Sequence, residues 1–521
     1  MKAGAALQPF AAKAVMVVTK KENVHVLAFD LGASSGRAMV GTLDRSAPGG
    51  PVVRLEEVHR FPNEPVAAGG HLYWDVLRLL HELKQGFRKA AEGREIAGFG
   101  IDTWGVDYGL LGADGELLGN PYHYRDSRTD YTVDKVHDII GADSLFARTG
   151  LQPLVFNTLM QLHAALEQGS VALEQAKELL FMPDLLLYLL TGVKQSEYTI
   201  ASTSQLLKAG TQEWDTELLE RLGIPVDILQ PVVMSGRVVG SLSADVCAEL
   251  KLPPIAAVAV PEHDTGAAVV SIPTDSADPS VYLISGTWSL FGTELPAPLL
   301  DLKALQLGFS NEGGMGGTSR TLKNIMGLWL IQECKREWDR EGKGHSFGEL
   351  VGLAAEAPAF QSFINPDDLK FLPPNGMPER IREYCRETGQ PVPETRGEIT
   401  RCIYESLAMQ YKLVLERLEA LTGNRYERLN MMGGGIQNKL LCQMTASAIG
   451  RPVWAGPVEA SSLGNVAAQL IALGELADIQ EARNLIKRSY PLDTYVPEES
   501  GQWAEAFGTF LRVTGQSIIP E

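Results

Sequence analysis

The sequence has no excess of positive charge. Its 521 residues include 46 lysines and arginines against 64 aspartates and glutamates, so the formal net charge is -18 and the pI is near 5.1. A protein that binds the backbone of a nucleic acid needs a basic surface, because it must displace the counterions of the phosphates. The composition therefore excludes that class. Any site for an anionic nucleotide has to be built locally, from backbone N–H groups, helix N-termini and a metal ion.

Cysteines are few and long apolar runs are missing. The five cysteines are scattered, without a C-x-x-C pair or a histidine at zinc spacing, which is typical of reduced thiols in the cytosol. Cys385 and Cys402 could meet across the loop between them, although disulfides are rare in that compartment. The longest apolar run, residues 181–190, is interrupted by Pro183 and Asp184 and is shorter than a membrane span of ~18 to 20 residues. We expect a cytoplasmic protein without a membrane segment or an obligatory protein partner.

Residues 1–22 are rich in small side chains but resemble no targeting signal. Gln8, Pro9 and Lys13 interrupt the apolar core that a signal peptide needs, so we expect an N-terminal extension that is not cleaved. The chain is too long for one hydrophobic core, and 45% of its residues are hydrophobic. Two globular domains are therefore expected.

Strand and helix signals alternate in the first half of the chain. Residues 24–30 (VHVLAFD) and 37–43 predict a hairpin with a Gly/Ser-rich tip, and residues 96–102 predict a buried strand. Helices are expected at residues 74–91, 158–166 and 184–190. This alternation indicates an α/β architecture.

The polar segment SIPTDSADPS at 271–280 separates a second half, which opens with VYLISGTWSLFGTEL. That opening repeats the order strand, Gly/Ser/Thr turn, strand of the first hairpin. We therefore expect duplicated halves that face one another across a cleft, with a boundary in this segment. The predicted division is an extension at 1–22, a first domain at 23–272, a second domain at 273–500 and a tail at 501–521.

The two hairpin tips are candidate phosphate sites. In DLGASSGR (30–37), Asp30 ends a strand and is followed by small residues whose backbone N–H groups can converge on phosphate oxygens, while Asp30 could hold Mg²⁺ through water. Acid-glycine turns also close ordinary hairpins, so this tip alone is weak evidence. The second tip, SGTWS at 285–289, has the same composition. Two such tips are what a triphosphate between two domains requires.

Asp264 is the candidate catalytic base. It follows an expected strand at 255–260, in the segment PEHDTG at 261–266, and a carboxylate at a strand end can accept the proton of an attacking hydroxyl. The alternative is that Asp264 or Thr265 only caps a helix. His263 is expected to donate a hydrogen bond to substrate, since no second metal ligand stands at suitable spacing.

Three further segments carry polar or glycine-rich ends. IDTWGVD at 101–107 has the acid, ring and glycine of a sugar site, although Trp104 could equally be core. KNIMG at 323–327 is expected to lead into a helix at 328–338, with Gln332 further along it. GGGIQN at 433–438 permits flat backbone contact with a purine or ribose. A helix at 400–421 has the apolar spacing of a packed face.

Together these motifs resemble the FGGY carbohydrate kinase family, from about Val24 to near Pro497. The segments that carry the resemblance, in the family's order, are DLGASSGR (30–37), GIDTWGVDYGLL (100–111), YRDSRT (124–129), EHDT (262–265), SGTWSL (285–290), NEGG (311–314), LKNIMGLWLIQ (322–332), GGGIQN (433–438) and AGPVEASSLGN (455–465).

The resemblance implies a fold and a reaction. The fold is two actin-like, ribonuclease-H-like domains of the ASKHA type, with a cleft between them that closes on ATP and a sugar. The reaction is transfer of the γ-phosphate of Mg²⁺-bound ATP to the 1-hydroxyl of L-rhamnulose. The expected partners are therefore the small-molecule sugar and ATP.

The resemblance also assigns roles to residues, motif by motif. Asp264 matches the catalytic base, and Asp30 matches the acid that positions the metal. The residues matching nucleotide contacts are Ala33, Ser34, Ser35, Gly36, Arg37, Thr287, Gln332 and Gly434. The residues matching sugar contacts are Gly105, His263, Asp264, Thr265 and Asn324.

Two features depart from the family pattern: Glu262 stands where a small residue is expected, and the extension before Val24 has no counterpart. Three alternatives remain at this point. The first is a kinase of the same family acting on L-fuculose, xylulose or ribulose, and the second is a non-catalytic sugar sensor of the same fold. The third is an actin- or chaperone-like ATPase, for which no partner-binding domain is found in the sequence.

Overall fold

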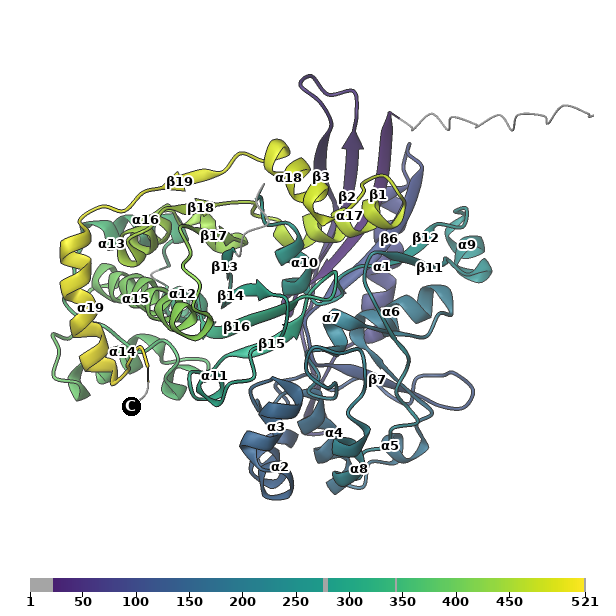
Figure 1. Cartoon of the computed structure of the whole chain (residues 1–521), viewed down its shortest axis with the longest axis horizontal. Helices are drawn as coiled ribbons and strands as arrows, with labels where there is room; N and C mark the ends of the chain where they lie inside the picture. The colour runs from purple at the N-terminus through teal and green to yellow at the C-terminus, as the bar shows by residue number, and fades with distance from the viewer. Residues whose placement is uncertain (1–21, 275–279, 343, 520–521) are drawn as a thin grey trace, which may run out of the picture.

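The computed structural model describes residues 22–274, 280–342 and 344–519. Residues 1–21 of the expected extension and the middle of the expected boundary lie outside these ranges. Two β-sheets, each covered by helices, form the two lobes seen in Figure 1. The α/β prediction is confirmed.

The first sheet contains the predicted hairpin and buried strand. Its strands, in spatial order, are β11 (Arg237–Ser241), β12 (Ala256–Ala259), β6 (Ile96–Thr103), β1 (Asn23–Leu31), β2 (Ser35–Asp44) and β3 (Val52–Pro62). β1, β2 and β3 are antiparallel neighbours, whereas β6 runs parallel to β1 and β12 parallel to β6. Parallel neighbours place the carboxyl ends of β1, β6 and β12 at the same edge.

The second sheet repeats this topology in its five central strands and has seven strands against six. Its order is β15 (Ser310–Gly313), β16 (Ser319–Met326), β14 (Trp288–Leu295), β13 (Val281–Ser285), β17 (Leu429–Met432), β18 (Val453–Ala455) and β19 (Asp493–Tyr495). β13, β14 and β16 are antiparallel, and β17 and β18 continue parallel to β13. The duplication expected from the two hairpins thus extends to five strands of each sheet.

Alternating side chains of β1 bury both faces of the first sheet. Leu27 and Phe29 pack against α1 (Val76–Ala90) and α6 (Met182–Thr191), while Val26 and Ala28 belong to a second core on the other face. A two-residue period with apolar side chains on both sides is typical of a strand between helical layers.

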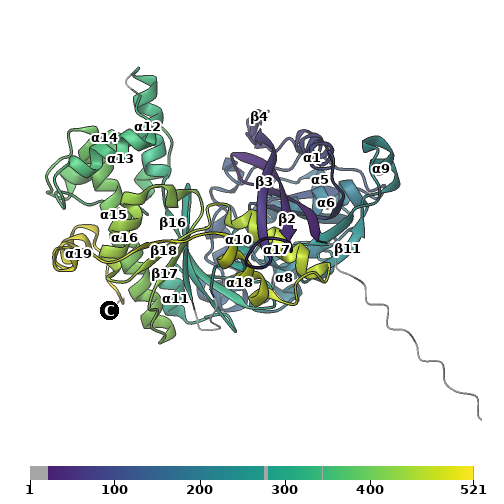
Figure 2. The same ribbon diagram turned by 90° about the horizontal axis from the view of Figure 1, so that it is seen from above.

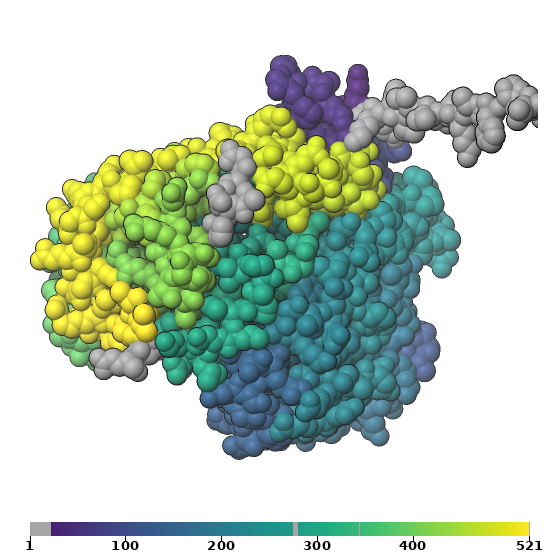
Figure 3. All heavy atoms as spheres, in the orientation of Figure 1, coloured from purple at the N-terminus to yellow at the C-terminus, as the bar shows by residue number. Residues whose placement is uncertain are grey.

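The helices on the second face come from the far end of the chain. α17 (Ala460–Ala472) and α18 (Ile479–Ser489) supply Leu463, Val466 and Ile486 to the core beneath β1. In Figures 1 and 2, α17 and α10 (Asp264–Val270) lie between the two sheets, and Figure 3 shows the yellow C-terminal residues against the purple strands. Residues assigned to the second domain by sequence position therefore pack on the first sheet.

The remaining helices build the second lobe around α15 (Arg396–Thr422), whose predicted apolar face is buried. α19 (Ser500–Thr514), most of the expected tail, packs Trp503, Phe507 and Phe510 into the same core. The segment KNIMG at 323–327 leads into a helix as predicted, and residues 323–326 form the end of strand β16. The helix, α12 (Trp329–Arg340), starts after Gly327 and Leu328.

In the part of the chain that the structure describes, no helix is both long and apolar enough to cross a membrane.

All five cysteines are free thiols. Cys385 and Cys402 are buried side by side, and a hydrogen bond between the two thiols lowers the pKa of Cys385.

Candidate active site

Three carboxylates meet where parallel strands of the first sheet end. Asp30 on β1 is the register partner of Asp102 on β6, and Thr103 forms a bridge with His263 in the turn after β12. The Thr103 backbone N–H donates to the carbonyl of Glu262 over 2.8 Å, which holds that turn beside β6. Asp264 follows as the first residue of α10. The topology therefore brings both predicted acids, Asp30 and Asp264, to one edge.

Asp102 belongs to the segment expected at a sugar site, but the sequence predicted no catalytic or metal-binding role for it. It is fully buried, its Oδ2 accepts a 2.7 Å hydrogen bond from Asn465 Nδ2, and its Oδ1 has no partner among the described residues. Burial, followed by the nearby charges of Asp30 and Asp264, raises its pKa. The available signal was its position at the end of a predicted buried strand, the same position that singled out Asp30.

The segment 459–465 completes this edge from the other end of the chain. Ser462 Oγ donates to Asp30 Oδ2 over 2.8 Å, and Glu459 forms an ion pair with Arg37. Arg37 also lies 3.3 Å from Asp30 Oδ2. Arg37 is therefore held between two carboxylates, so its side chain orders the acidic edge of the site.

The first predicted phosphate tip is a tight turn between β1 and β2. The Gly32 N–H donates to the carbonyl of Ser35 over 2.9 Å, and Asn63 braces the turn through Gly32 and Ser34. Ser34 is exposed at the tip, with Ala33 and Ser35 half-buried beside it. Gly36 has another role, because a Cβ there would lie 2.3 Å from the Phe61 ring.

The second tip gathers the predicted nucleotide contacts of the second sheet. Thr287 Oγ1 donates to Gln332 Oε1 over 3.1 Å, so the turn after β13 and helix α12 are joined. Gly433 has a φ of +85°, and a Cβ there would lie 2.9 Å from the carbonyl oxygen of Ser285. The next residue, Gly434, faces open space, since a Cβ on it would meet nothing within 4 Å.

Asn324 and Gly105 occupy different surroundings. Asn324 is half-buried on strand β16, opposite Leu290 of β14. Gly105 lies against Thr203, whose Oγ1 would be 3.1 Å from a Cβ at this position. The next residue, Val106, has a φ of 69° and donates its N–H to the same hydroxyl. A non-glycine residue in this conformation is strained, and such strain concentrates at functional sites.

Trp104 is a core residue, which resolves the alternative left open by the sequence. It is 6% exposed, and its ring centroid lies 4.0 Å from that of Trp74. Both indole N–H groups donate to Asp107 Oδ2, over 2.6 Å from Trp74 and 3.0 Å from Trp104. Burial raises the pKa of Asp107 to about 6, although these hydrogen bonds oppose the rise.

Asp264 is a partly exposed carboxylate oriented by its neighbour Thr265. Its side chain is 32% exposed, and Oδ1 accepts from Thr265 N at 2.5 Å and from Thr265 Oγ1 at 3.0 Å. Burial raises its pKa, with a further rise from Asp30, while His263 opposes both. Thr265 thus orients the carboxylate, and Asp264 begins α10 without being its N-cap, which is His263.

His263 Nε2 lies 3.4 Å from Asp264 Oδ1, and its other ring nitrogen contacts the second sheet. Nδ1 is 3.1 Å from Glu312 on β15 and 3.2 Å from Arg320 on β16. Glu312 lies within the NEGG motif, where the sequence predicted no role for it. Its 49-residue separation from His263 hides this contact from any local pattern.

Glu262, the departure from the family pattern, belongs to a buried group of carboxyl side chains. It hydrogen-bonds Asp184, and its backbone N–H donates to Glu197 Oε2 over 3.1 Å. Burial raises the pKa of both Asp184 and Glu262, and the charge of Glu197 adds to the rise in each. Two carboxyl groups can bond one another only when one of them carries a proton. Glu262 is therefore part of the buried support of the turn that carries His263 and Asp264.

This arrangement predicts a stability effect for Glu262→Gln. A carboxyl group whose pKa is higher in the folded than in the unfolded protein stabilises the fold only where it stays protonated. The stability of the wild type should therefore fall as pH rises above about 4. The amide replaces the shared proton permanently. We expect the variant to lose less stability between pH 5 and pH 8, with an advantage of about 1 to 3 kcal/mol at pH 8.

Thermal unfolding of both proteins at pH 5 and pH 8 measures this difference. Glu220→Gln is the matched control, because Glu220 is exposed on α8 (Thr216–Arg221). Parallel pH dependence of the Glu262→Gln variant and the wild type would contradict the shared proton.

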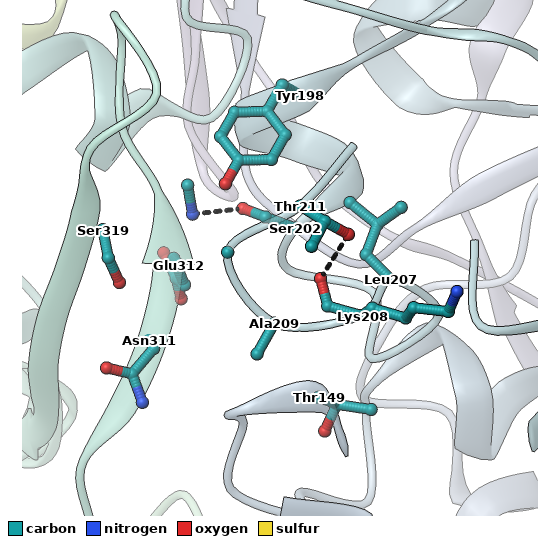
Figure 4. A pocket seen from close by; sticks show the side chains of 12 residues that line it. Thr149, Tyr198, Ser202, Leu207, Lys208, Ala209, Thr211, Asn311, Glu312 and Ser319 are labelled. Atoms are coloured by element: carbon teal, nitrogen blue, oxygen red, sulfur yellow. Dashed lines mark hydrogen bonds between the residues drawn. The ribbon is translucent and has the colours of Figure 1, made fainter. Parts of the chain in front are cut away.

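A small pocket lies behind Glu312, on the seam between the two lobes (Figure 4). Tyr198 and Ser202 line it from the first half of the chain, and Asn311, Glu312 and Ser319 from the second. The seam is bonded directly, since the Gly313 N–H donates to Ser202 Oγ over 2.7 Å. The pocket therefore marks where β15 docks on α7 (Tyr198–Ala201).

Comparisons with known proteins agree with this architecture. The N-terminal domain of the FGGY family of carbohydrate kinases matches residues 25–271, and its C-terminal domain matches residues 281–473. A rhamnulokinase of Bacteroides thetaiotaomicron is 46% identical over 93% of this chain and 98% of its own length. A rhamnulokinase of Halalkalibacterium halodurans is 41% identical over 91% and 98%.

Solved structures share the fold at low identity. A ligand-bound xylulose kinase from Lactobacillus acidophilus has a TM-score of 0.76 at 15% identity, covering 94% of this chain and 97% of its own. Plasmodium falciparum glycerol kinase with ADP has a TM-score of 0.73 at 14% identity, covering 95% and 98%. The predicted two-domain, actin-like architecture is confirmed. With both family domains matched across most of its length, the chain belongs to the FGGY family of carbohydrate kinases.

Proposed function

We propose that the chain catalyses the ATP-dependent phosphorylation of L-rhamnulose at its 1-hydroxyl, giving L-rhamnulose 1-phosphate and ADP, as a cytoplasmic step of L-rhamnose catabolism. The choice of sugar is supported by relatives of 41 to 46% identity that are named rhamnulokinase. The observation that carries the reaction is the meeting of Asp30, Asp102 and Asp264 at one sheet edge. Phosphoryl transfer needs such an edge, where one acid takes a proton and others position a metal.

Asp264 is proposed as the general base. Its carboxylate accepts the proton of the sugar 1-hydroxyl while that oxygen attacks the γ-phosphorus in line. Its raised pKa brings its basicity closer to working pH, and its two bonds from Thr265 fix its orientation. Partial exposure of the side chain leaves it accessible to a substrate.

The other assignments follow the two halves of the fold. Residues 23–272 would hold the sugar through Gly105, His263 and Thr265, and residues 273–500 would hold the nucleotide, with Asn324 reaching the sugar from β16. The predicted nucleotide contacts at the two tips are Ala33, Ser34, Ser35, Gly36, Arg37, Thr287, Gln332 and Gly434. The exposed turn at Ser34 and the open space around Gly434 support these roles.

Mg²⁺ fits the acidic edge. It prefers oxygen donors and binds with one or two carboxylates while keeping several waters and phosphate ligands. Asp30 and Asp102 supply such oxygens, and Asp102 Oδ1 is a buried acceptor without a partner among the described residues. When bound, the ion would neutralise charge on the phosphates.

The test measures ADP release by the full chain with Mg-ATP and one of L-rhamnulose, L-fuculose, D-xylulose, L-ribulose or glycerol, beside a blank without sugar. Highest kcat/KM on L-rhamnulose with a negligible blank is expected. Preference for another sugar would keep the chemistry and reject the substrate. Hydrolysis in the blank would favour an ATPase, and no turnover on any sugar would favour a sensor.

A further inference from the structure

Glu312 and Arg320 form an ion pair on the second sheet, beside the turn that carries His263 and Asp264. They are register partners on β15 and β16, and Arg320 Nη2 donates to Glu312 Oε2 over 2.8 Å. Arg320 is fully buried, Glu312 is 8% exposed, and Arg320 Nε is anchored on the carbonyl of Gly313 over 2.8 Å. Burying two charges costs free energy unless their attraction and further hydrogen bonds compensate for the lost hydration.

Both members of this pair contact His263. The Nδ1 atom of this histidine lies 3.1 Å from Glu312 Oε2, and its Nε2 atom lies 3.4 Å from Asp264 Oδ1. The imidazole thus stands directly between a carboxylate of the second sheet and the proposed base. Its side chain is 10% exposed, so these neighbours and not solvent decide which nitrogen carries hydrogen.

The charges favour hydrogen on Nδ1. His263 and Arg320 lower the pKa of Glu312 to about 2 despite its burial, so Glu312 is a permanent anion that can only accept hydrogen bonds. Arg320, at 3.2 Å from Nδ1, can only donate and would favour the opposite tautomer. Arg320 Nη2 makes its shorter contact, 2.8 Å, with Glu312, and the carboxylate is a charged acceptor 3.1 Å from Nδ1, so it is the stronger partner for Nδ1.

Helix α7 keeps the spacing between the two sides. The His263 N–H donates to Thr199 Oγ1 over 3.2 Å, and Thr199 in turn donates to Glu197. On the other side, Ser202 accepts from Gly313, and a Cβ at Gly313 would lie 2.5 Å from the Tyr198 ring. Figure 4 shows Glu312 facing Tyr198 and Ser202 across this seam.

We propose that Glu312 is a positioning residue for phosphoryl transfer: it holds hydrogen on Nδ1 of His263 and thereby fixes the ring with an unprotonated Nε2 beside Asp264, where Nε2 accepts a hydrogen bond from a sugar hydroxyl instead of donating one as expected from the sequence. This inference rests on the proposed function, because it assigns Glu312 a part in the transfer step. It also makes catalysis depend on the docking of the second sheet on the first, since Glu312 reaches His263 only when β15 lies against α7.

The first test is Glu312→Gln in the full chain, assayed with Mg-ATP and L-rhamnulose from pH 6 to pH 9. The amide has the same shape but no charge, so we expect kcat to fall about 100-fold, with a changed pH profile and the KM for ATP within about twofold. Glu312→Asp, which restores the charge, should recover part of kcat.

Glu294→Gln is the matched control. Glu294 lies opposite Arg320 on β14 and pairs with Arg483 over 2.5 Å, but it makes no bond to His263. It should retain wild-type kcat and pH profile. Equal losses in both variants, or a Glu312→Gln variant with unchanged kcat and profile, would overturn the proposal.

A second measurement is independent of the substrate. Long-range ¹H–¹⁵N spectra of histidine-labelled protein report which ring nitrogen is protonated, and His263→Asn identifies the signals of His263. We expect protonated Nδ1 in the wild type and altered ring signals in Glu312→Gln. Identical His263 signals in the two proteins would reject the inference, whereas failure on L-rhamnulose with the expected spectra would reject only the proposed sugar.

Discussion

Asp264→Asn should lower kcat by about 10²- to 10⁴-fold while leaving the KM for ATP nearly unchanged. The amide keeps the shape of the side chain and can still accept from Thr265, whose N–H and hydroxyl both bond Oδ1 in the wild type. It cannot take a proton from the sugar. The loss should therefore appear in turnover and not in nucleotide binding, measured by steady-state kinetics over a range of ATP concentrations.

Asp143→Asn is a suitable control, because Asp143 is exposed in the first turn of α3 (Ala142–Thr149), away from the acidic edge. Thermal unfolding of both variants should match the wild type to within a few degrees. Near-normal turnover of a folded Asp264→Asn variant would reject Asp264 as the base and leave Asp30 and Asp102 as the acids to examine.

Gly464→Ala should strongly destabilise the protein, although the change adds one methyl group. Gly464 lies where α17 crosses α10, and its Cβ would be 1.7 Å from the Ala267 carbonyl oxygen and 2.5 Å from the carbonyl carbon. Both atoms are backbone, so one helix has to move. Overpacking of this kind costs about 3 kcal/mol or more, and we expect Tm to fall by about 5 °C or more.

The crossing also concerns activity, because α10 starts at Asp264 and α17 carries Ser462 and Asn465, which bond Asp30 and Asp102. The turnover of the Gly464→Ala variant should be lower than that of the wild type even at temperatures below the Tm of the variant. Gly508→Ala on α19 is the control: that glycine has open space around it, and alanine is the better helix former. A Gly464→Ala variant with unchanged Tm would show that the helices can separate without cost.

Local sequence patterns were sufficient for the elements and for part of the site. A two-residue apolar period followed by glycine and serine predicted both hairpins, and the acids at strand ends predicted Asp30 and Asp264. The segment at 323–327 was expected to lead into a helix, and it does so as the end of β16, with α12 starting two residues later than Gly327. Trp104 could not be assigned from sequence, since a ring at a strand end serves equally in a core or a sugar site.

What the sequence by itself determined is therefore the α/β class, the duplicated hairpins, the family and the acids that end β1 and precede α10. Only the tertiary structure decided that Asp102 joins them through Asn465, that α17 covers the first sheet, and that Glu312 reaches His263. The physical reason is the separation along the sequence of the residues that specify each feature. A strand or turn is specified by neighbouring residues, whereas a contact across 49 or 363 positions depends on how two sheets and the helices between them pack.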